Sequence, residues 1–387
     1  MRTLIELYDP MPINNVLGTE MFRPQETVFL CPPEVEDNRV LRQALKRYFD
    51  HRQVPVKLTF LSVNMVDSVK IERVLREVLE SHQDCAIDIS GGTDASLFAA
   101  GVASGNSAVF TYSRKRNTFF EIRNAPFARS APCNVRLDVE SCFLMAGGTL
   151  LPGRESNHRL KERLPEIDKL FKVYSSHRRV WNQQISYIQK ISSAEAGALD
   201  AAGKLTEKAG NKRVTADADL LRALERAGLI RGLAVTETSV RFRFPDETVR
   251  FWLRDIGAVL ELQVYRACLC ADCFDDVVLS AIVNWEGGHI QRDSVTNEID
   301  VVAVQGIHPV FISCKTCEIR TEALNELAIL RDRFGGKWSR AVIVTSASAT
   351  KSRAPMRRRA AELNIEVIEW NDLPLERLIQ RVRPGKP

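Results

Sequence analysis

The sequence contains no long apolar run. Among its 387 residues there is no stretch of about 18 consecutive uncharged apolar residues, roughly the length a transmembrane helix needs. Residues 1–9 also reach charged side chains too early for a secretory signal peptide. Both absences argue against a membrane partner, and we expect a cytoplasmic protein.

The sequence also lacks a strong excess of one charge. Its 54 Lys and Arg residues against 49 Asp and Glu residues give a formal net charge of +5. This mild excess permits nucleic acid as a partner but does not require it. With 45% hydrophobic and 27% charged residues, the composition is that of an ordinary globular protein.

The nine cysteines form no regular framework, which is typical of a protein from a reducing compartment. Two groups, Cys268-x-Cys270-x-x-Cys273 and Cys314-x-x-Cys317, have thiols close enough in sequence for a zinc site. The first group, however, has irregular spacing for a zinc knuckle and falls where a helix should end. Buried thiols without metal are therefore the favoured interpretation.

The chain is long enough for two or three domains, each with its own core. We expect an α/β protein with boundaries at 1–150, 151–250 and 251–387. In the first segment, strand patterns (4–8, 26–31, 56–61 and 84–89) alternate with amphipathic helix patterns (39–51, 68–81 and 94–103). This alternation predicts a parallel sheet with helices on both faces, and residues 138–148 are expected to close the domain with a helix.

The fourth strand runs directly into Ser90-Gly91-Gly92-Thr93 and then into the helix 94–103. Glycines let backbone N–H groups approach an anion, and a helix N-terminus favours negative charge. The loop also leaves the carboxyl end of a strand, where open α/β sheets bind ligands. The alternative is a tight turn in which Ser90 or Thr93 caps the helix.

The second segment is dominated by charged helical patterns, at 160–174 and 179–191. A helix at 217–226 and a hairpin at 233–244 then give a winged-helix-like outline. Its candidate recognition helix is nearly neutral, whereas a DNA reader of this type needs a basic one. We therefore favour a connector that lies between the two end domains over a DNA reader.

The third segment contains two apolar runs, 297–304 and 309–316, that predict a β-hairpin. Asp300 in the first run and Lys315 in the second are expected nearly opposite each other at the open end. A carboxylate there can hold a divalent cation, and a lysine can steady an attacking water or a phosphate oxygen. The alternative is a buried ion pair at the mouth of the hairpin.

Further acidic residues flank this hairpin. Glu261 lies on a largely apolar helix at 256–265, and Glu322 and Glu326 share one face of a helix at 322–330. A buried strand pattern follows at 340–345. The sequence thus orders a helix acid, a strand acid and a strand lysine around one sheet.

The order Glu261, Asp300, Lys315 on helix, strand and hairpin strand resembles the PD-(D/E)xK nuclease core. More narrowly, Gly257-x-x-Leu260-Glu261, Asn297-Glu298-Ile299-Asp300 and Phe311-Ile312-x-Cys314-Lys315 resemble the nuclease half of CRISPR-associated CARF nucleases. That family is switched on by cyclic oligoadenylates. The resemblance implies a restriction-endonuclease-like C-terminal domain that cuts DNA and/or RNA with Mg²⁺ or Mn²⁺.

The N-terminal segment carries the second half of the resemblance. Ser90-Gly91-Gly92-Thr93, with a polar loop after the first strand that includes Asn14, resembles the cyclic-nucleotide pocket of Rossmann-like CARF domains. The family dimerises, and its ring-shaped ligand lies across the two-fold axis. Asp94 stands where a basic residue often follows in the family, which is unfavourable beside a phosphate unless its carboxylate points away. Arg114-Lys115-Arg116 is expected to be a solvated turn.

Ser313 departs from the family pattern, which has an acid two residues before the lysine. Some restriction enzymes with Ser-x-Lys take the missing carboxylate from the following helix. Glu326 is the preferred substitute here and Glu322 the alternative. The resemblance then implies Glu261, Asp300 and Glu326 as metal ligands and catalytic residues, with Lys315 as the fourth catalytic residue.

Two other functions stay open on the sequence alone. If no helix acid replaces the residue at Ser313, the protein is a non-catalytic cyclic-nucleotide sensor or nucleic-acid binder with a degenerate nuclease domain. A winged-helix regulator would depend on the middle segment alone.

Overall fold

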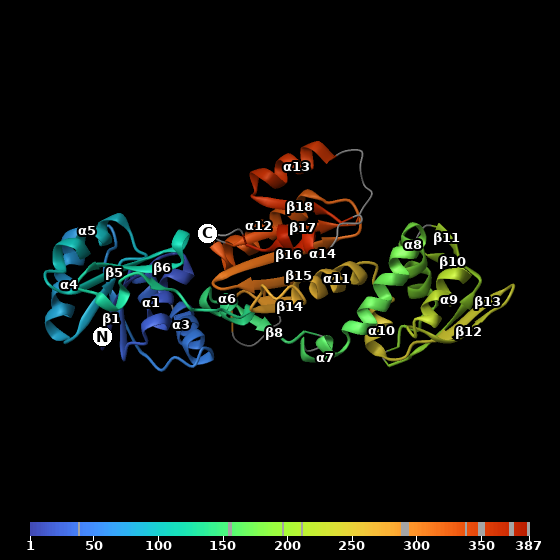
Figure 1. Cartoon of the computed structure of the whole chain (residues 1–387), viewed down its shortest axis with the longest axis horizontal. Coiled ribbons are helices and arrows are strands. Elements are labelled where there is room, and N and C mark those ends of the chain that lie inside the picture. Colours follow the sequence, from blue (N-terminus) through green and yellow to red (C-terminus); the bar gives the residue numbers. More distant parts are fainter. Residues whose placement is uncertain are drawn as a thin grey trace.

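The computed structural model describes residues 1–37, 39–153, 157–195, 197–209, 212–287, 294–336, 339–346, 353–370 and 375–384. Figure 1 shows three parts in a row, with the C-terminal sheet in the middle, the N-terminal sheet on one side and the winged-helix-like segment on the other. Within the described residues, no helix combines the length and the hydropathy that a membrane span requires.

The N-terminal part is a seven-stranded sheet in the order β3-β2-β1-β4-β5-β6-β7. Strands β1 to β5 are parallel to one another, as expected for a Rossmann-like sheet. Strand β6 pairs antiparallel with both β5 and β7. Helices α1 and α3 cover one face, and α4 and α5 cover the other. The strands are β1 Thr3–Leu7, β2 Glu26–Cys31, β3 Lys57–Ser62, β4 Cys85–Asp88, β5 Ala108–Ser113, β6 Thr118–Arg123 and β7 Ala131–Pro132. The helices are η1 Pro12–Asn15, α1 Leu17–Phe22, α2 Pro33–Asp37, α3 Arg39–His51, α4 Ser68–Ser81, α5 Asp94–Ala103, η2 Arg114–Arg116 and η3 Pro126–Ala128.

The C-terminal part is a six-stranded mixed sheet in the order β18-β17-β16-β15-β14-β8. The β15–β16 hairpin is the predicted one, and β17 and β18 continue from β16 in parallel. Its strands are β8 Thr149–Leu151, β14 Asp276–Asn284, β15 Thr296–Gln305, β16 His308–Lys315, β17 Arg340–Thr345 and β18 Ile365–Glu369. Its helices are α6 Val139–Met145, α10 Glu247–Trp252, α11 Ala258–Leu269, α12 Thr321–Phe334, α13 Arg353–Glu362 and α14 Leu375–Val382.

Two separate cores cover the two faces of this sheet. On the first, the α11 face, Leu260 and Val264 pack with Val301 and Ile312 of the hairpin. On the second, the α12 face, the buried residues come from α12, α6 and the alternate positions of the strands: Phe143, Val302, Phe311, Leu324 and Leu327. Because side chains alternate across a strand, one apolar hairpin feeds both cores.

Helix α6 and strand β8 lie with the C-terminal sheet. Phe143 of α6 makes edge-to-face ring contacts with Phe311 and Phe334, at centroid distances of 6.4 and 5.0 Å. Strand β8 pairs antiparallel with β14. The helix expected to close the N-terminal domain is therefore present, but it packs in the C-terminal core.

The middle segment forms a small domain around one long helix. This helix, α8, replaces the two expected helices and departs from helical backbone angles only at His177. A three-stranded sheet in the order β12-β13-β9 and a separate β10–β11 hairpin complete it. Its elements are α7 Asn157–Glu162, α8 Leu164–Ile191, β9 Asp200–Lys204, β10 Thr206–Ala209, β11 Lys212–Thr215, α9 Ala218–Arg226, β12 Arg231–Val235 and β13 Ser239–Arg243.

The expected position of this connector between the two end domains is wrong. Its buried residues continue into the α11 face of the C-terminal sheet, whereas the N-terminal core continues into the α12 face. The C-terminal sheet therefore lies between the other two parts (Figure 1). The sequence does not reveal this order. An apolar stripe on a helix or strand predicts that this face is buried, but it does not identify the element that packs against it.

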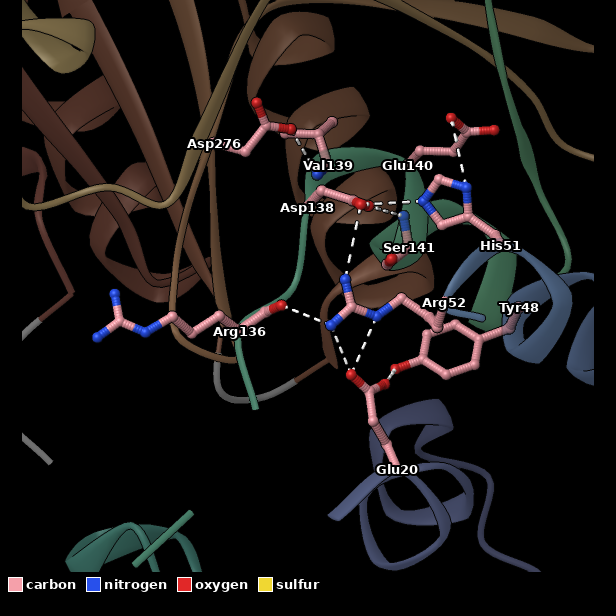
Figure 2. Close-up of polar contacts among 10 residues, drawn as sticks. All are labelled: Glu20, Tyr48, His51, Arg52, Arg136, Asp138, Val139, Glu140, Ser141 and Asp276. Carbon is pink, nitrogen blue, oxygen red and sulfur yellow. Dashed lines mark hydrogen bonds and ion pairs between the residues drawn. The ribbon is translucent and has the colours of Figure 1, made fainter. Parts of the chain in front are cut away.

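A polar junction joins the N-terminal part to the C-terminal sheet (Figure 2). The Arg52 guanidinium donates to Glu20 Oε1, at 3.0 Å from Nε, and to the Arg136 carbonyl at 2.7 Å. It also lies 3.7 Å from the Asp138 carboxylate. Tyr48 donates a hydrogen bond to the other carboxylate oxygen of Glu20, Oε2, so both oxygens of this buried carboxylate have partners.

The junction continues from the start of α6 into the C-terminal hairpins. The Val139 amide donates to Asp276 Oδ2 at 2.9 Å, and Arg136 pairs with Asp275 at 2.7 Å. Asp275 in turn accepts the Gly306 amide, in the β15–β16 turn, at 2.6 Å. A continuous set of polar contacts thus runs from α1 and α3 to the β15–β16 turn, at the end of the hairpin away from Asp300 and Lys315.

Candidate functional site

Asp300 and Lys315 lie at the open end of the β15–β16 hairpin, as the sequence predicts. The Lys315 ammonium is 3.5 Å from Asp300 Oδ2. The same oxygen accepts the Cys314 backbone N–H at 2.5 Å and the Ser313 hydroxyl at 3.1 Å. Ser313, at the position where the family has an acid, therefore contacts the strand carboxylate directly.

The orientation of Asp300 follows from a local break in strand alternation. Ile299 and Val301 are two residues apart but pack into opposite cores. The facing strand β14 is irregular opposite Asp300. Ser280 there adopts φ +49°, and its neighbours Leu279 and Ala281 pair with β15 whereas Ser280 itself does not. Such irregularities re-aim side chains next to functional sites, and here Asp300 and Ser280 both line one cavity on the α11 face.

This cavity, which we call the acidic cavity, has a volume of about 700 Å³. It lies between the C-terminal sheet and the connector and is lined by five carboxylates: Glu247, Asp255, Glu261, Glu298 and Asp300. Burial raises the pKa of Glu261 to about 8, and the negative charges of Asp300, Asp255 and Glu298 add to this effect, against Lys315. Glu261 and Asp300 are thus brought together with Lys315.

The structure does not bring Glu326 to this cluster. Its helix, α12, covers the opposite face of the sheet through Leu324 and Leu327. Glu326 is exposed, and its carboxylate accepts a hydrogen bond from Asn297 at 2.6 Å. For the described residues, no contact links Glu326 or Glu322 to Asp300.

The carboxylate oxygens of the acidic cavity are the type of ligand that a hard divalent cation prefers. Carboxylate oxygens are the ligands that Mg²⁺ and Mn²⁺ prefer, and mutual repulsion of buried carboxylates is what a cation relieves. Over the described ranges, however, no three His, Cys, Asp or Glu side chains are grouped as a complete metal site. Glu261 and Asp300 are the two carboxylates of the cavity that the sequence predicts as metal ligands, and Lys315 lies beside Asp300.

The cysteines are all free thiols. Cys268 and Cys314 are buried in the core of the α11 face, whereas Cys270 and Cys317 are exposed. Burial raises the pKa of the Cys268 thiol, which disfavours the thiolate that binds zinc.

The Ser90–Thr93 loop lies at the carboxyl end of β4, where the sequence places it. Thr93 caps α5: its hydroxyl accepts the Ser96 N–H at 3.2 Å, and its own N–H donates to the Ser96 hydroxyl at 2.9 Å. The Gly92 N–H donates to Asp9 Oδ2 at 3.0 Å. Two backbone N–H groups of the loop, those of Gly92 and Thr93, therefore already donate to side chains of the protein. Asp94 is exposed at the first turn of α5.

Two buried carboxyl groups lie beneath this loop, in register on β1 and β4. Asp88 Oδ1 accepts the Ser90 N–H at 2.7 Å, and burial raises the pKa of Asp88 to about 7. Burial and the neighbouring Asp88 together raise the pKa of Glu6 well above its usual value. The base of the loop therefore carries less negative charge near neutral pH than two ionised carboxylates would.

The sequence did not predict that Arg114 lies beside the Ser90–Thr93 loop. Instead of lying in a solvated turn, its guanidinium is half-buried and donates to Asn14 Oδ1 at 2.8 Å, beside the Ser90–Thr93 loop. Burial lowers the pKa of Arg114 to about 10, so it stays charged at neutral pH. One signal was available: β5 is parallel to β4, so the turn after β5 must return to the same edge as the loop.

We expect Gly92→Ala to destabilise the N-terminal domain by about 1–3 kcal/mol, because a non-glycine residue is strained at this backbone conformation. Gly92 has φ +105°, and a Cβ there would lie 2.9 Å from the Leu7 Cβ. The matched control is Gly101→Ala in α5, where an added Cβ meets no heavy atom within 4 Å. That change should stabilise the domain by about 0.5–1 kcal/mol. Urea titrations measure both, and equal effects would contradict the strained-loop argument.

Residues 245–383 match the family described as Card1-like, endonuclease domain. No curated protein matches the chain by sequence. The match covers the acidic cavity's β14–β16 strands, helix α11 and the α10 segment in front of it.

Solved structures share the fold over nearly the whole chain. Protein VC1899 from Vibrio cholerae has a TM-score of 0.76 at 18% identity, covering 98% of this chain and 96% of that one. Can2 from Sulfobacillus thermosulfidooxidans, solved in complex with cyclic tetra-adenylate, has a TM-score of 0.71 at 17% identity, covering 98% and 99%. A type III CRISPR defence DNA nuclease activated by cyclic oligoadenylate has a TM-score of 0.53 at 16% identity, covering 100% of this chain and 53% of that one. The endonuclease-domain match and this shared fold confirm the resemblance to the CRISPR-associated CARF nucleases that the sequence predicts.

Proposed function

We propose that this protein is a metal-dependent nuclease of antiviral defence, activated by a cyclic oligoadenylate and acting in the cytoplasm on DNA and/or RNA. The observation that carries the proposal is that Glu261 and Asp300 line the acidic cavity and Lys315 pairs with Asp300, all inside the segment that matches an endonuclease domain family. The bound ligand of Can2 and the description of the type III CRISPR nuclease support the activator class.

Glu261 and Asp300 would hold Mg²⁺ or Mn²⁺ in the acidic cavity. When bound, the ion would polarise the phosphate and lower the pKa of a water. Lys315 places a positive charge next to Asp300, where it offsets the negative charge that develops on the phosphate in the transition state. The Ser313 hydroxyl and the Cys314 N–H hold the Asp300 carboxylate in place. A ligand role for Glu326 stays a prediction without geometric support.

Ser90, Gly91, Gly92, Thr93 and Asn14 are the proposed ligand-binding residues. To these we add Arg114, whose guanidinium supplies the positive charge that a phosphate needs at this edge of the sheet. The exposed position of Asp94 leaves its carboxylate free to point away from such a phosphate.

The protein is proposed to act as a homodimer through the α4–α5 surface beside the ligand loop. Large apolar side chains gather there: Val66 and Val69 are 77% and 75% exposed, and Phe98 is 68% exposed. Val102 lies one helical turn after Phe98 on the same face of α5 and is also exposed. Exposed apolar patches of this kind mark association surfaces.

We expect Phe98→Glu to convert the dimer to a monomer, because a buried unpaired carboxylate at the interface is strongly unfavourable. Light scattering on a sizing column measures the mass. The matched control is Ile329→Glu, which changes an exposed apolar residue on α12, 56% exposed and far from this patch in the fold. A dimer that survives Phe98→Glu, or a wild-type protein that is already a monomer, would contradict the proposed surface.

The polar junction is the proposed route from the ligand pocket to the nuclease part. Glu20 lies on α1, which directly follows the loop that carries Asn14. Arg52 ties Glu20 to the segment before α6, and that segment is tied in turn to the β14 and β15–β16 ends. A shift of α1 on ligand binding would therefore act on the turn of the catalytic hairpin and, through its two strands, on Asp300 and Lys315.

The deciding experiment measures cleavage of plasmid, single-stranded DNA and RNA with Mn²⁺, with and without cyclic tetra-adenylate and cyclic hexa-adenylate. We expect cleavage that depends on both metal and one of the two rings. Binding of a ring without any cleavage would favour the alternative, a non-catalytic sensor in which Ser313 marks lost chemistry. Cleavage that does not respond to either ring would contradict the activator assignment.

A further inference from the structure

The acidic cavity has a second wall that the proposed metal site does not use. This wall is formed by α10 and by the turn from Leu253 to Gly257 that leads into α11. Its basic side chains Arg250 and Arg254 line the cavity together with Glu247 and Asp255 of the same wall. A nucleic-acid strand is a polyanion, so entry into a cavity with five carboxylates requires positive charge near its path.

Arg250 is held by the protein through both of its Nη atoms. It is 6% exposed, its Nη1 donates to Glu247 at 2.9 Å, and its Nη2 donates to the carbonyls of Ser193 and Glu195 at 2.8 and 3.1 Å. These contacts fasten the connector to α10. Arg250 is therefore a structural residue.

Arg254 differs from Arg250 in its contacts. Of the residues that the structure describes, none accepts a hydrogen bond from the Nη atoms of Arg254, and its buried Nε, like that of Arg250, has no partner. A buried donor without an acceptor costs about 1–3 kcal/mol, so its retention at a cavity wall points to an acceptor that binds there.

The turn holds the Arg254 backbone in a fixed position. Leu253 before it is fully buried and donates its N–H to the Val249 carbonyl at 3.0 Å. Asp255 after it accepts the Gly257 N–H at 2.7 Å and so fixes the entry to α11. Because both neighbours are anchored, the Arg254 side chain extends from a rigid base, which reduces the entropy lost on binding.

We propose that Arg254 is a substrate-binding residue that contacts a backbone phosphate of the nucleic-acid strand next to the one that is cut. The inference rests on the proposed nuclease function and names a contact for that same cavity. An arginine fork matches the two free oxygens of a phosphodiester, and such a contact is independent of base sequence. Arg254 thus positions the strand, whereas Glu261, Asp300 and Lys315 act at the reacting phosphate.

The test compares Arg254→Ala and Arg254→Lys with the wild-type protein on one labelled single-stranded oligonucleotide. Loss of one charged phosphate contact should raise KM about 10-fold to 100-fold for Arg254→Ala and change kcat less. The slope of log(kcat/KM) against log salt should fall by about 0.7, the value for one phosphate of a single strand. Arg254→Lys keeps the charge and should keep the slope.

The matched control is Arg222→Ala, on the exposed surface of α9, where the arginine pairs with Asp219 one turn away. A second measurement uses oligonucleotides that carry one neutral methylphosphonate at successive positions. At one position, the methylphosphonate should weaken cleavage by the wild-type protein about 10-fold. The same substitution should not weaken cleavage by Arg254→Ala any further, because the phosphate contact is already lost.

The outcomes separate the inference from the function on which it rests. If the wild-type protein cuts but Arg254→Ala matches Arg222→Ala in KM and in salt slope, the Arg254 contact is wrong and the nuclease function stands. If the wild-type protein cuts nothing with metal and either cyclic ring, the nuclease function is wrong and the inference falls with it. A fall in kcat with unchanged KM and unchanged slope also overturns the contact.

Discussion

Asp300→Asn is expected to reduce ligand-activated cleavage by about 10³-fold or more, since a metal-assisted reaction loses several kcal/mol of transition-state stabilisation without its anchoring carboxylate. The asparagine has nearly the same shape, and its amide oxygen can still accept the Cys314 N–H that Asp300 accepts at 2.5 Å. The folded structure should therefore persist while the charge is lost. Initial cleavage rates at saturating activator and Mn²⁺ give the measurement.

Glu326→Gln is the comparison that shows whether α12 supplies a metal ligand. Its carboxylate is exposed and bonded to Asn297, so we expect this variant to keep most of the activity. Equal losses in Asp300→Asn and Glu326→Gln would show that α12 moves toward the cavity in the active state. Unchanged cleavage in Asp300→Asn would refute the active site proposed here.

The second large effect is expected at the polar junction, where Arg52→Ala should lower the free energy of unfolding by about 3 kcal/mol. Removal of the guanidinium leaves the Glu20 carboxylate, 7% exposed, without its cation. The Arg136 carbonyl loses its donor as well. Urea titration followed by tryptophan fluorescence and by circular dichroism measures the change and shows whether the domains unfold together.

Arg243→Ala is the matched control for this variant. Arg243 also pairs with a carboxylate, Asp200 at 2.7 Å, but both side chains are more than half exposed, so we expect little change in stability. The double variant Glu20→Ala with Arg52→Ala should lose less than the sum of the two single variants, because neither partner is then left alone. If Arg52→Ala costs no more than Arg243→Ala, the junction does not hold the two parts together.

Arg52→Ala also tests the proposed route of activation. The residue touches neither the ligand loop nor the acidic cavity. We therefore expect the affinity for the cyclic activator to persist and the stimulation of cleavage to fall. Full stimulation in a folded Arg52→Ala protein would remove the junction from the mechanism.

The sequence predicts the catalytic hairpin well because two local signals agree there. A continuous apolar run defines each strand, and the short turn at Gly306 sets their register, which brings Asp300 and Lys315 to one end. Glu261 is placed correctly for a similar reason, since a single acid on a largely apolar helix must lie at the edge of that helix's contact with the sheet.

The position of Glu326 could not be predicted in the same way. The apolar stripe of α12 shows that the helix covers a sheet, but either face of a doubly covered sheet satisfies that pattern. Only the three-dimensional path of the chain assigns α11 and α12 to opposite faces. The partners of Arg52 are also hidden in the sequence, because Glu20 lies 32 residues before Arg52, and Arg136 and Asp138 lie more than 80 residues after it.

The acidic cavity is built by segments that are distant in sequence: Leu160 and Gln189 contribute from the connector, and Asp300 from the sheet. A small molecule bound between them would touch both and would lie apart from the Ser90–Thr93 loop, in a different part of the fold. Inhibition at the cutting end and competition at the sensing end can therefore be pursued as independent pharmacological targets within a single polypeptide.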